Sequence, residues 1–213
     1  MTPAFELSTT AAESIYQCLL EMGQRHTNPV LEVLAQPDRI EQGVKYPPGR
    51  LRFGDGPLRA YYHVHTEPYL RPGEHGHFHL FVATTSLESE TRWCHVAGLS
   101  MNHQGQPVRW FAVNNWVTGG TWLDADTLWV DIMAALTVDP AGYSLLERWL
   151  AGMLGLYLSE LQQLLQERDA ALAAESAGQP LPEVLQERAI YELSAVPINL
   201  LDMLQTWLVG QTV

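Results

Sequence analysis

The sequence predicts an α+β fold, an antiparallel β-meander of about four strands covered by N- and C-terminal helices. Two patterns carry this prediction. Short runs rich in aromatic and β-branched residues alternate polar and apolar side chains in the middle third of the chain. Before and after that third, apolar residues recur at helical spacing. We expect a single domain over residues 1–213, with the sheet at about 44–122.

The first helix is expected at about 9–26, where threonines can cap its start and Ile15, Leu19 and Met22 share one face. A shorter apolar segment, NPVLEVLAQ, follows it. Prolines and glycines then interrupt regular structure up to about residue 57. The N-terminal part therefore supplies an amphipathic helix that can cover a sheet.

The expected strands follow one another along the chain, separated by turn clusters such as YLRPGE and NHQGQP. Gly105 lies in the loop between the third and fourth strands, which is consistent with a hairpin. The four strands are LRAYYHVH, HGHFHLFVAT, WCHVAGLSM and VRWFAVNNWV.

The C-terminal part, about 124–210, is expected to be helical because its apolar period changes to 3.6. Asp124 can cap a helix over ADTLWVDIMAAL, and Asp139 followed by Pro140 can start a long helix that runs to about residue 175. Its many leucines form core by default, and a surplus of them would suit a homodimer face. Two shorter helices, PEVLQERAIYELSA and PINLLDMLQTWLV, complete the chain.

Composition limits the class of partner. The chain has 24 acidic and 12 basic residues and a formal net charge of −12, which repels nucleic-acid phosphates and anionic lipids. We expect neither nucleic acid nor membrane as a partner. No signal peptide pattern or membrane-length apolar run occurs, so we expect a cytoplasmic protein. Cys18 and Cys94 lie far apart, which excludes a disulfide framework and a CxxC metal site.

Histidines gather in one segment, YYHVHTEPYLRPGEHGHFHLF, at residues 61–81. Because alternate residues of a strand share a face, the apolar side chains Phe78 and Leu80 belong against the helices. The opposite face of the predicted hairpin would carry five imidazoles, those of His63, His65, His75, His77 and His79.

Pairing the two runs as a hairpin places His63 opposite His77 and His65 opposite His75, with Cβ atoms about 4.5–5.5 Å apart. Imidazoles at this separation can converge on one ion. Three or four histidine ligands, with an open coordination position, suit a divalent metal such as zinc, iron or manganese. We therefore expect a metal site on the hairpin, with Glu74 as a further ligand or a proton acceptor.

The reaction at such a site is left open by the sequence. An ion with a free position would activate water or bind oxygen, so a metal-dependent hydrolase or oxygenase of unknown substrate is one interpretation. A non-enzymatic module is the alternative. Its histidine face would hold a small anionic ligand together with Arg71, or would respond to pH through protonation below about pH 6.5.

Two further histidines are assigned differently. His95 is expected to share its face with Trp93, Ala97 and Leu99 as a core histidine, although a sheet neighbour could make it a fourth metal ligand. His103 lies in a turn and is expected to be solvated.

The segment NNWVTGGTW ends the fourth predicted strand. Asn114 and Asn115 are candidate contacts to a small-molecule ligand near the histidine face, with Trp116 and Trp122 as an aromatic wall. The alternative is that the glycine pair makes a tight turn while the tryptophans pack. The chain has no GxSxG, Walker, GxGxxG or HExxH motif, which excludes the commonest hydrolase, nucleotide and zinc-protease sites.

Short motifs resemble two known families. HGHFHLF resembles the histidine triad signature of nucleotide hydrolases and transferases, and this resemblance implies that the middle histidine, His77, attacks phosphorus. Gly76 departs from that signature, where an apolar residue is usual. HVH is similar to the first half of a cupin metal motif, without the glutamate that should follow.

A broader resemblance combines YYHVH, EHGHFHLF and the segment from HVAGLSM to VNNWVTGGTW with a helical C-terminus. This combination is similar to an uncharacterised bacterial family known only as a domain of unknown function. The resemblance covers residues from about 10 to 200. It implies a bacterial source and one domain, and it implies no activity.

Overall fold

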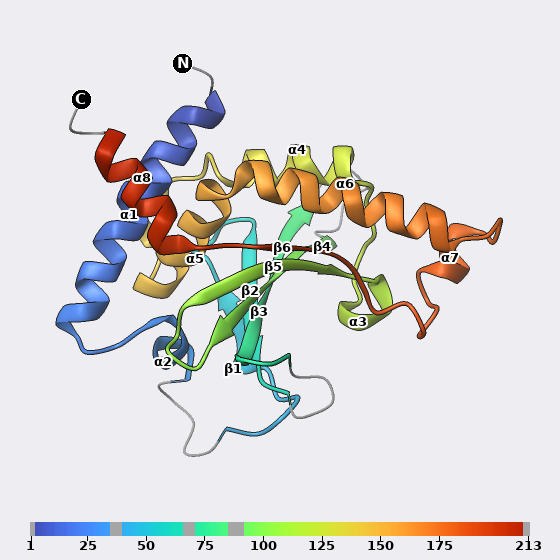
Figure 1. Ribbon diagram of the computed structural model, residues 1–213, viewed down its shortest axis with the longest axis horizontal. Helices are drawn as coiled ribbons and strands as arrows, with labels where there is room; N and C mark the ends of the chain where they lie inside the picture. Colours follow the sequence, from blue (N-terminus) through green and yellow to red (C-terminus); the bar gives the residue numbers. More distant parts are fainter. Residues whose placement is uncertain (1–2, 35–39, 66–70, 85–91, 211–213) are drawn as a thin grey trace.

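The structure, a computed structural model, describes residues 3–34, 40–65, 71–84 and 92–210. Its centre is an antiparallel sheet of six strands in the order β1-β2-β3-β4-β5-β6, so every strand pairs with its neighbours along the chain. Helices from both ends of the chain accompany this sheet (Figure 1). The predicted α+β class and meander order are therefore confirmed.

The four inner strands are the four that the sequence predicts. They are β2 (Leu58–His63), β3 (Glu74–Thr84), β4 (Arg92–Asn102) and β5 (Pro107–Val113). Each of these strands pairs with a neighbour on both sides. Their β-branched and aromatic residues and the alternation of their side chains are typical of such inner strands, so the sequence identifies them. The predicted number of strands was too small by the two edge strands.

The edge strands are β1 (Tyr46–Arg52) and β6 (Glu192–Pro197). β1 has the sequence YPPGRLR, and an edge position tolerates its prolines because one side of the strand needs no ladder hydrogen bonds. β6 was predicted as the end of a helix, and that prediction is wrong. Its residues pair with β5 instead, which shows a tertiary contact overriding local propensity.

The helices follow the predicted order with two corrections. The single long helix expected from Asp139 is divided into the 3-10 turn η1, then α5, then α6. Ser144 and Glu147 form a capping box at the start of α5, and the backbone breaks at Tyr157, where φ is −106° and ψ is 36°. The segment PEVLQERAIYELSA is helical only over α7 and then becomes β6.

Asp124 accepts a hydrogen bond from the Thr127 backbone N–H and caps α4, as predicted. The bounds of the helices are α1 (Pro3–Gln24), α2 (Pro29–Leu34), α3 (Asn115–Thr118), α4 (Ala125–Ala135), η1 (Pro140–Gly142), α5 (Leu145–Leu156), α6 (Leu158–Glu175), α7 (Leu181–Val184) and α8 (Leu200–Gly210).

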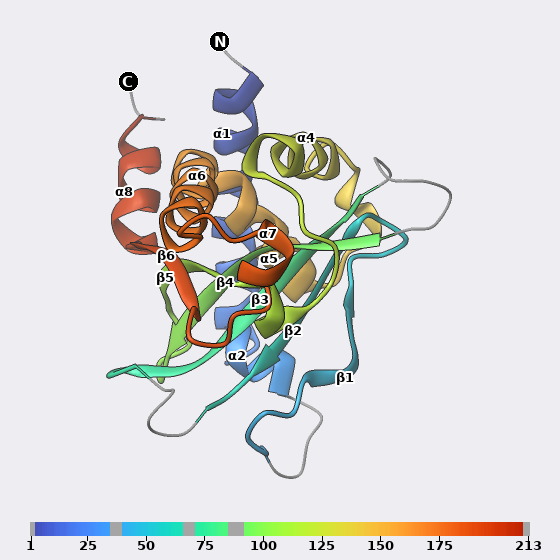
Figure 2. The same ribbon diagram turned by 90° about the vertical axis from the view of Figure 1, so that its right-hand side faces the viewer.

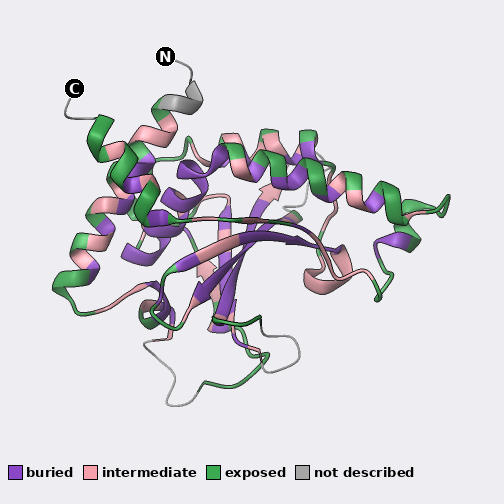
Figure 3. Ribbon diagram, viewed as in Figure 1, coloured by how far each residue is buried: buried purple, intermediate pink, exposed green. Residues whose placement is uncertain are grey.

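The main core lies between the helices and one face of the sheet (Figures 1 and 2). Phe78 and Leu80 of β3 meet Ile15 of α1, Ile132 of α4 and Trp149 of α5 in one buried cluster. The apolar face of the hairpin therefore packs against helices, as expected. Figure 3 shows that the central strands are buried along most of their length, so side chains on the opposite face are also largely withdrawn from water.

None of the described helices combines the length with the apolar character that crossing a membrane requires.

On the face of the sheet opposite the helices, position 98 of β4 has room only for a glycine. Phe111 of β5 lies opposite Gly98, and a Cβ built there would overlap the Phe111 ring. Gly98→Ala should therefore lower the free energy of unfolding by about 1–3 kcal/mol, the usual cost of overpacking a core. Urea unfolding followed by circular dichroism measures this change.

Gly23→Ala in α1 is the matched control because a Cβ there meets nothing within 4 Å. The same substitution should be neutral or stabilising at this helical position, by up to about 1 kcal/mol. Equal effects of the two substitutions would contradict the close approach of Phe111 to β4.

Candidate metal centre

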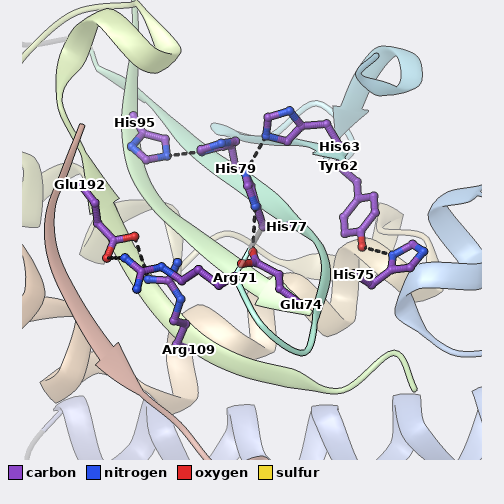
Figure 4. A network of polar contacts seen from close by, with 10 residues as sticks. All are labelled: Tyr62, His63, Arg71, Glu74, His75, His77, His79, His95, Arg109 and Glu192. Carbon is purple, nitrogen blue, oxygen red and sulfur yellow. Dashed lines mark hydrogen bonds and ion pairs between the residues drawn. The ribbon is translucent and has the colours of Figure 1, made fainter. Parts of the chain in front are cut away.

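Three imidazoles of the hairpin converge on one point. His63 and His77 are direct cross-strand partners in the β2–β3 pair, which confirms the predicted pairing of these two residues. The Nε2 atoms of these two residues lie 2.7 Å apart (Figure 4). His65 follows β2, and its ring centroid lies 4.4 Å from that of His63. One ring nitrogen from each of the three histidines lies within 4.8 Å of the others, close enough to share an ion.

Glu74 orients His77. The Glu74 Oε1 lies 3.0 Å from the His77 Nδ1, and both side chains are buried. A carboxylate in this position favours a proton on Nδ1 and leaves Nε2 with its lone pair free for a metal ion. Burial raises the Glu74 pKa, but the hydrogen bond and charge of His77 and the Arg109 charge outweigh burial and lower that pKa overall. Glu74 is therefore a carboxylate at neutral pH.

The surroundings keep the other two histidines neutral. Burial, followed by the charges of His77, His65 and Lys45, lowers the pKa of His63 to about 2. Burial, followed by the His77 charge, also lowers the pKa of His65. A metal ion binds only the neutral imidazole, so these shifts keep both rings available as ligands across the physiological pH range.

His79 forms a second pair with His95 beside the first cluster. The His79 Nδ1 lies 2.9 Å from the His95 Nε2, and His79 is almost completely buried. The ring centroids of His79 and His77 are 4.9 Å apart. His79 was predicted as a ligand, and the structure places it next to the convergent group of three rather than within it.

The predicted environment of His95 is wrong because β4 contains a bulge. Leu80 pairs with Ala97 whereas Phe81 pairs with His95, so the register shifts by one residue at this point. The shift places Ala97 in the helix-facing core and leaves His95 in contact with His79. Strict alternation of side chains along the sequence does not predict a bulge, so it assigned His95 to the wrong face.

A second bulge separates His75 from the group of His63, His65 and His77. The β3–β4 register shifts between Glu74 and Gly76, and the His75 Nδ1 lies 2.7 Å from the Tyr62 hydroxyl. Tyr62 belongs to the helix-facing core. The prediction that His75 shares the face of His77 is therefore wrong. Gly76 permits this arrangement because a Cβ there would lie 2.7 Å from the Tyr62 Oη.

Other predicted neighbours have different partners. Arg71 was expected to hold an anion with the histidines, but its Nη2 donates to Glu192 Oε1 at 2.6 Å. The Arg109 Nη1 donates to the other oxygen of Glu192 at 2.9 Å (Figure 4). His103 is exposed, as expected. Glu67, a second carboxylate near the hairpin loop, lies outside the described residues.

Asn114 and Asn115, the predicted ligand contacts, lie at the end of β5. The Asn114 side chain is fully buried, caps α3 and donates to the backbone oxygen of Val184 at 2.9 Å. It therefore joins α3 to α7. Asn115 instead borders a small cavity of ≈ 10 Å³ together with His95 and the buried Arg168. A space of this size is suited to a water molecule and excludes an organic ligand.

The sequence missed the aromatic surroundings of the cluster. Tyr61 of β2 lies 5.6 Å from His63 and 5.2 Å from His79, measured between ring centroids. Phe111 of β5 lies 5.0 Å from His77. Both rings share the histidine face, and both sit at alternate positions of predicted strands. Alternation counted from His63 would have found Tyr61, whereas Phe111 depends on how β5 is placed beside β4.

A family model matches residues 9–198, a range that includes every residue of the cluster. The chain belongs to the DUF6969 family. The description of this family is a domain of unknown function, which agrees with the resemblance seen in the sequence. No curated protein and no solved structure matches the chain significantly. DUF6969 thus supplies no activity, and the chemistry has to be inferred from the site.

His95 should make the metal-free protein sensitive to acid. Burial, then the charges of Arg168 and His77, lower its pKa to about 3, below the value of about 6.5 in an unfolded chain. The unfolded chain therefore binds the proton first, and folding stability falls as the pH drops below about 6.5 towards 3. The contribution of one such group is at most about 1.4 kcal/mol per pH unit.

Urea unfolding of metal-stripped protein at pH 7, 6 and 5 tests this prediction. His95→Gln should reduce the loss of stability between pH 7 and 5. The exposed His103→Gln is the control and should leave the wild-type slope unchanged. Parallel pH profiles for wild type and His95→Gln would contradict a neutral, half-buried His95.

Proposed function

We propose that this DUF6969 protein binds a divalent metal ion, zinc, iron or manganese, through His63, His65 and His77. The convergence of three ring nitrogens within 4.8 Å carries the proposal. A cluster of histidines does not stabilise a β-sheet by itself. Histidine has no special strand propensity, and neighbouring imidazoles repel one another when they are protonated. A shared ion explains the cluster as a single unit.

The chemistry of the donors supports these metals. Three neutral imidazoles with a carboxylate behind one of them resemble the ligand sets of catalytic zinc sites and of other first-row metal sites. At metal–nitrogen distances of about 2.0–2.1 Å, tetrahedral ligands lie about 3.4 Å apart. The 2.7 Å between the His63 and His77 Nε2 atoms then has to increase only slightly. The described cluster contains no thiolate, which disfavours soft metals.

Three protein ligands leave a coordination position open. A bound ion would supply activated water or an oxygen-binding position there, so the finer proposal is a metal-dependent hydrolase or oxygenase. Within this site the residues have separate roles. His63, His65 and His77 hold the ion, and Glu74 fixes the tautomer of His77 and takes part in proton transfer through it. The aromatic rings of Tyr61 and Phe111 limit the access of water.

A non-enzymatic binding module is the second candidate function. Lys45 approaches the cluster closely enough to lower the His63 pKa, and it lies over the Tyr61 ring at 4.5 Å from the centroid. A cation beside the histidines suits an anionic ligand. The histidine triad interpretation has less support, because His75 lies with Tyr62 and both ring nitrogens of His77 have partners, His63 and Glu74.

Replacing His77 tests the metal site. Protein expressed without a histidine tag should contain close to one equivalent of metal by inductively coupled plasma mass spectrometry. His77→Ala should lose at least nine tenths of it, since two remaining imidazoles bind first-row metals far more weakly. His65→Ala, at a more exposed ligand, repeats the test with less risk to folding.

His103→Ala is the control, because His103 is exposed and outside the group of three. It should retain the wild-type metal content. Full metal content in folded His77→Ala and His65→Ala would refute the assignment of the ligands.

Glu74→Gln separates orientation from ligation. Glutamine keeps a hydrogen-bond acceptor near the His77 Nδ1 but removes the charge, so zinc affinity should fall about 10–100-fold while excess zinc restores one equivalent. Competition with a chromophoric chelator measures both quantities. Unchanged affinity would contradict the role of Glu74 behind His77, and loss of binding even at excess zinc would make Glu74 a ligand instead.

A further inference from the structure

A second group of charged residues lies at the other end of the histidine face. Four of the 12 basic residues of the chain line one cavity of ≈ 820 Å³, and Asp55 is the one carboxylate among the lining residues that the structure describes. The protein as a whole carries a net charge of −12, so this local excess of positive charge opposes the general composition. The four cations are Lys45, Arg50, Arg52 and Arg59.

These cations are close together, and among the described residues none of them pairs with a carboxylate. Arg52 of β1 is the direct cross-strand partner of Arg59 of β2, an arrangement of like charges that destabilises a sheet. Neither of them, nor Lys45 or Arg50, forms an ion pair with a carboxylate among the described residues. The Arg59 Nε is buried and has no hydrogen-bond acceptor in that part of the chain. A negative charge bound beside these cations would lower their mutual repulsion.

The pKa shifts of Arg59 and Lys45 agree with mutual repulsion among the cations. Burial, followed by the charges of Arg50 and Arg52, lowers the Arg59 pKa to about 10. Burial and then the charges of Arg50 and Arg59 also lower the Lys45 pKa. The Arg59 pKa still lies well above neutral pH, so Arg59 keeps its positive charge there. An anion in the cavity would relieve the repulsion among them.

The backbone of β1 is distorted where it supplies Arg50. Gly49 and Arg50 both have positive φ, 88° and 71°, and the β1–β2 register is irregular between Tyr46 and Leu51. A left-handed conformation at a non-glycine residue is strained. Irregularities of this type re-aim a side chain, and here they place the Arg50 guanidinium 5.8 Å from the Tyr61 centroid.

The Arg59 guanidinium lies over two aromatic rings. The Arg59 guanidinium lies 4.1 Å from the Trp93 centroid and 5.2 Å from that of Phe81. These stacked positions hold the planar group in one orientation and leave its N–H donors at the edge. Fixed guanidinium donors match the oxygens of a phosphate group bidentately. The cavity therefore combines charge, donors and a flat apolar surface.

We propose that this cavity, between β1 and the ends of β2–β4, binds a small molecule through a phosphate or diphosphate group. Three arginines and a lysine around one carboxylate favour a multiply charged anion over a single carboxylate. A cavity of ≈ 820 Å³ also accommodates an organic portion, which Trp93 of the lining can contact. This binding does not depend on metal at the histidines. The phosphate site and the proposed metal centre can therefore be tested independently.

Titration calorimetry with inorganic pyrophosphate tests the proposal on full-length protein that has been stripped of metal and dialysed free of chelator. We expect saturable binding of about one equivalent that weakens as salt is raised, because the contacts are ionic. Citrate is the second probe, since it carries comparable charge on carboxylates. Pyrophosphate should bind at least tenfold more tightly than citrate, and the reverse order would overturn the phosphate assignment.

Variants locate the binding. Arg59→Met keeps an unbranched apolar stem over Trp93, and both it and Arg50→Gln should weaken pyrophosphate binding at least tenfold. Arg25→Gln is the control, because Arg25 is exposed in a pair with Glu21 and does not line the cavity. It should bind as wild type does. Arg52→Gln, at an exposed position, supplies a third variant if Arg59→Met does not fold.

Three results would overturn the proposal. They are the absence of pyrophosphate binding by wild type at concentrations on the order of 1 mM, equal binding by wild type and the folded cavity variants, and tighter binding of a DNA or RNA oligonucleotide than of pyrophosphate. Binding that survives in His77→Ala while metal is lost would support the independence of the two sites.

Discussion

The pairing of β2 with β3 is the constraint on which the rest of the site depends. It brings His63 opposite His77 and, through the same ladder, Tyr62 opposite Phe78. Because side chains alternate along a strand, a slip of one residue would send the imidazoles into the helix-facing core and expose the aromatic side chains. Burial of Tyr62 and Phe78 against the helices therefore fixes the register that creates the histidine cluster.

The two faces of the sheet consequently have different roles. One face supplies apolar side chains to the core and accounts for much of the folding energy. Along the other face, β2 presents Arg59, then Tyr61, then His63, which leads from the cationic cavity to the histidine cluster. Tyr61 contacts both ends, since it lies against His63 and beneath Lys45. A ligand held by the cations would therefore lie on the same face as the histidine cluster.

The sequence was sufficient for the parts of the structure that follow regular periods. Alternation in β2 and β3 predicted the hairpin, the register of His63 with His77, and the face that packs against helices. Helical spacing and Asp124 predicted α4 and its cap. These features are local or involve neighbouring strands with one register that buries the apolar face.

The remaining features depend on departures from those periods. Bulges near Gly76 and before Ala97 moved His75 away from the cluster and brought His95 to His79. Gly76 is a weak signal of the first bulge, whereas the second has no signature in residue type. β6 is defined by its pairing with β5 rather than by its own sequence. The cationic cavity joins residues of β1, a strand that prolines and glycines had hidden, to Arg59 and Trp93. Such contacts are established only when the sheet is assembled.

The most direct test of the metal centre is X-ray absorption at the zinc edge for protein reconstituted with one equivalent of zinc. Three imidazole nitrogens at about 2.0–2.1 Å and one further light-atom ligand are the predicted coordination shell. Sulfur in the shell, or fewer than two imidazoles, would contradict a centre built from His63, His65 and His77.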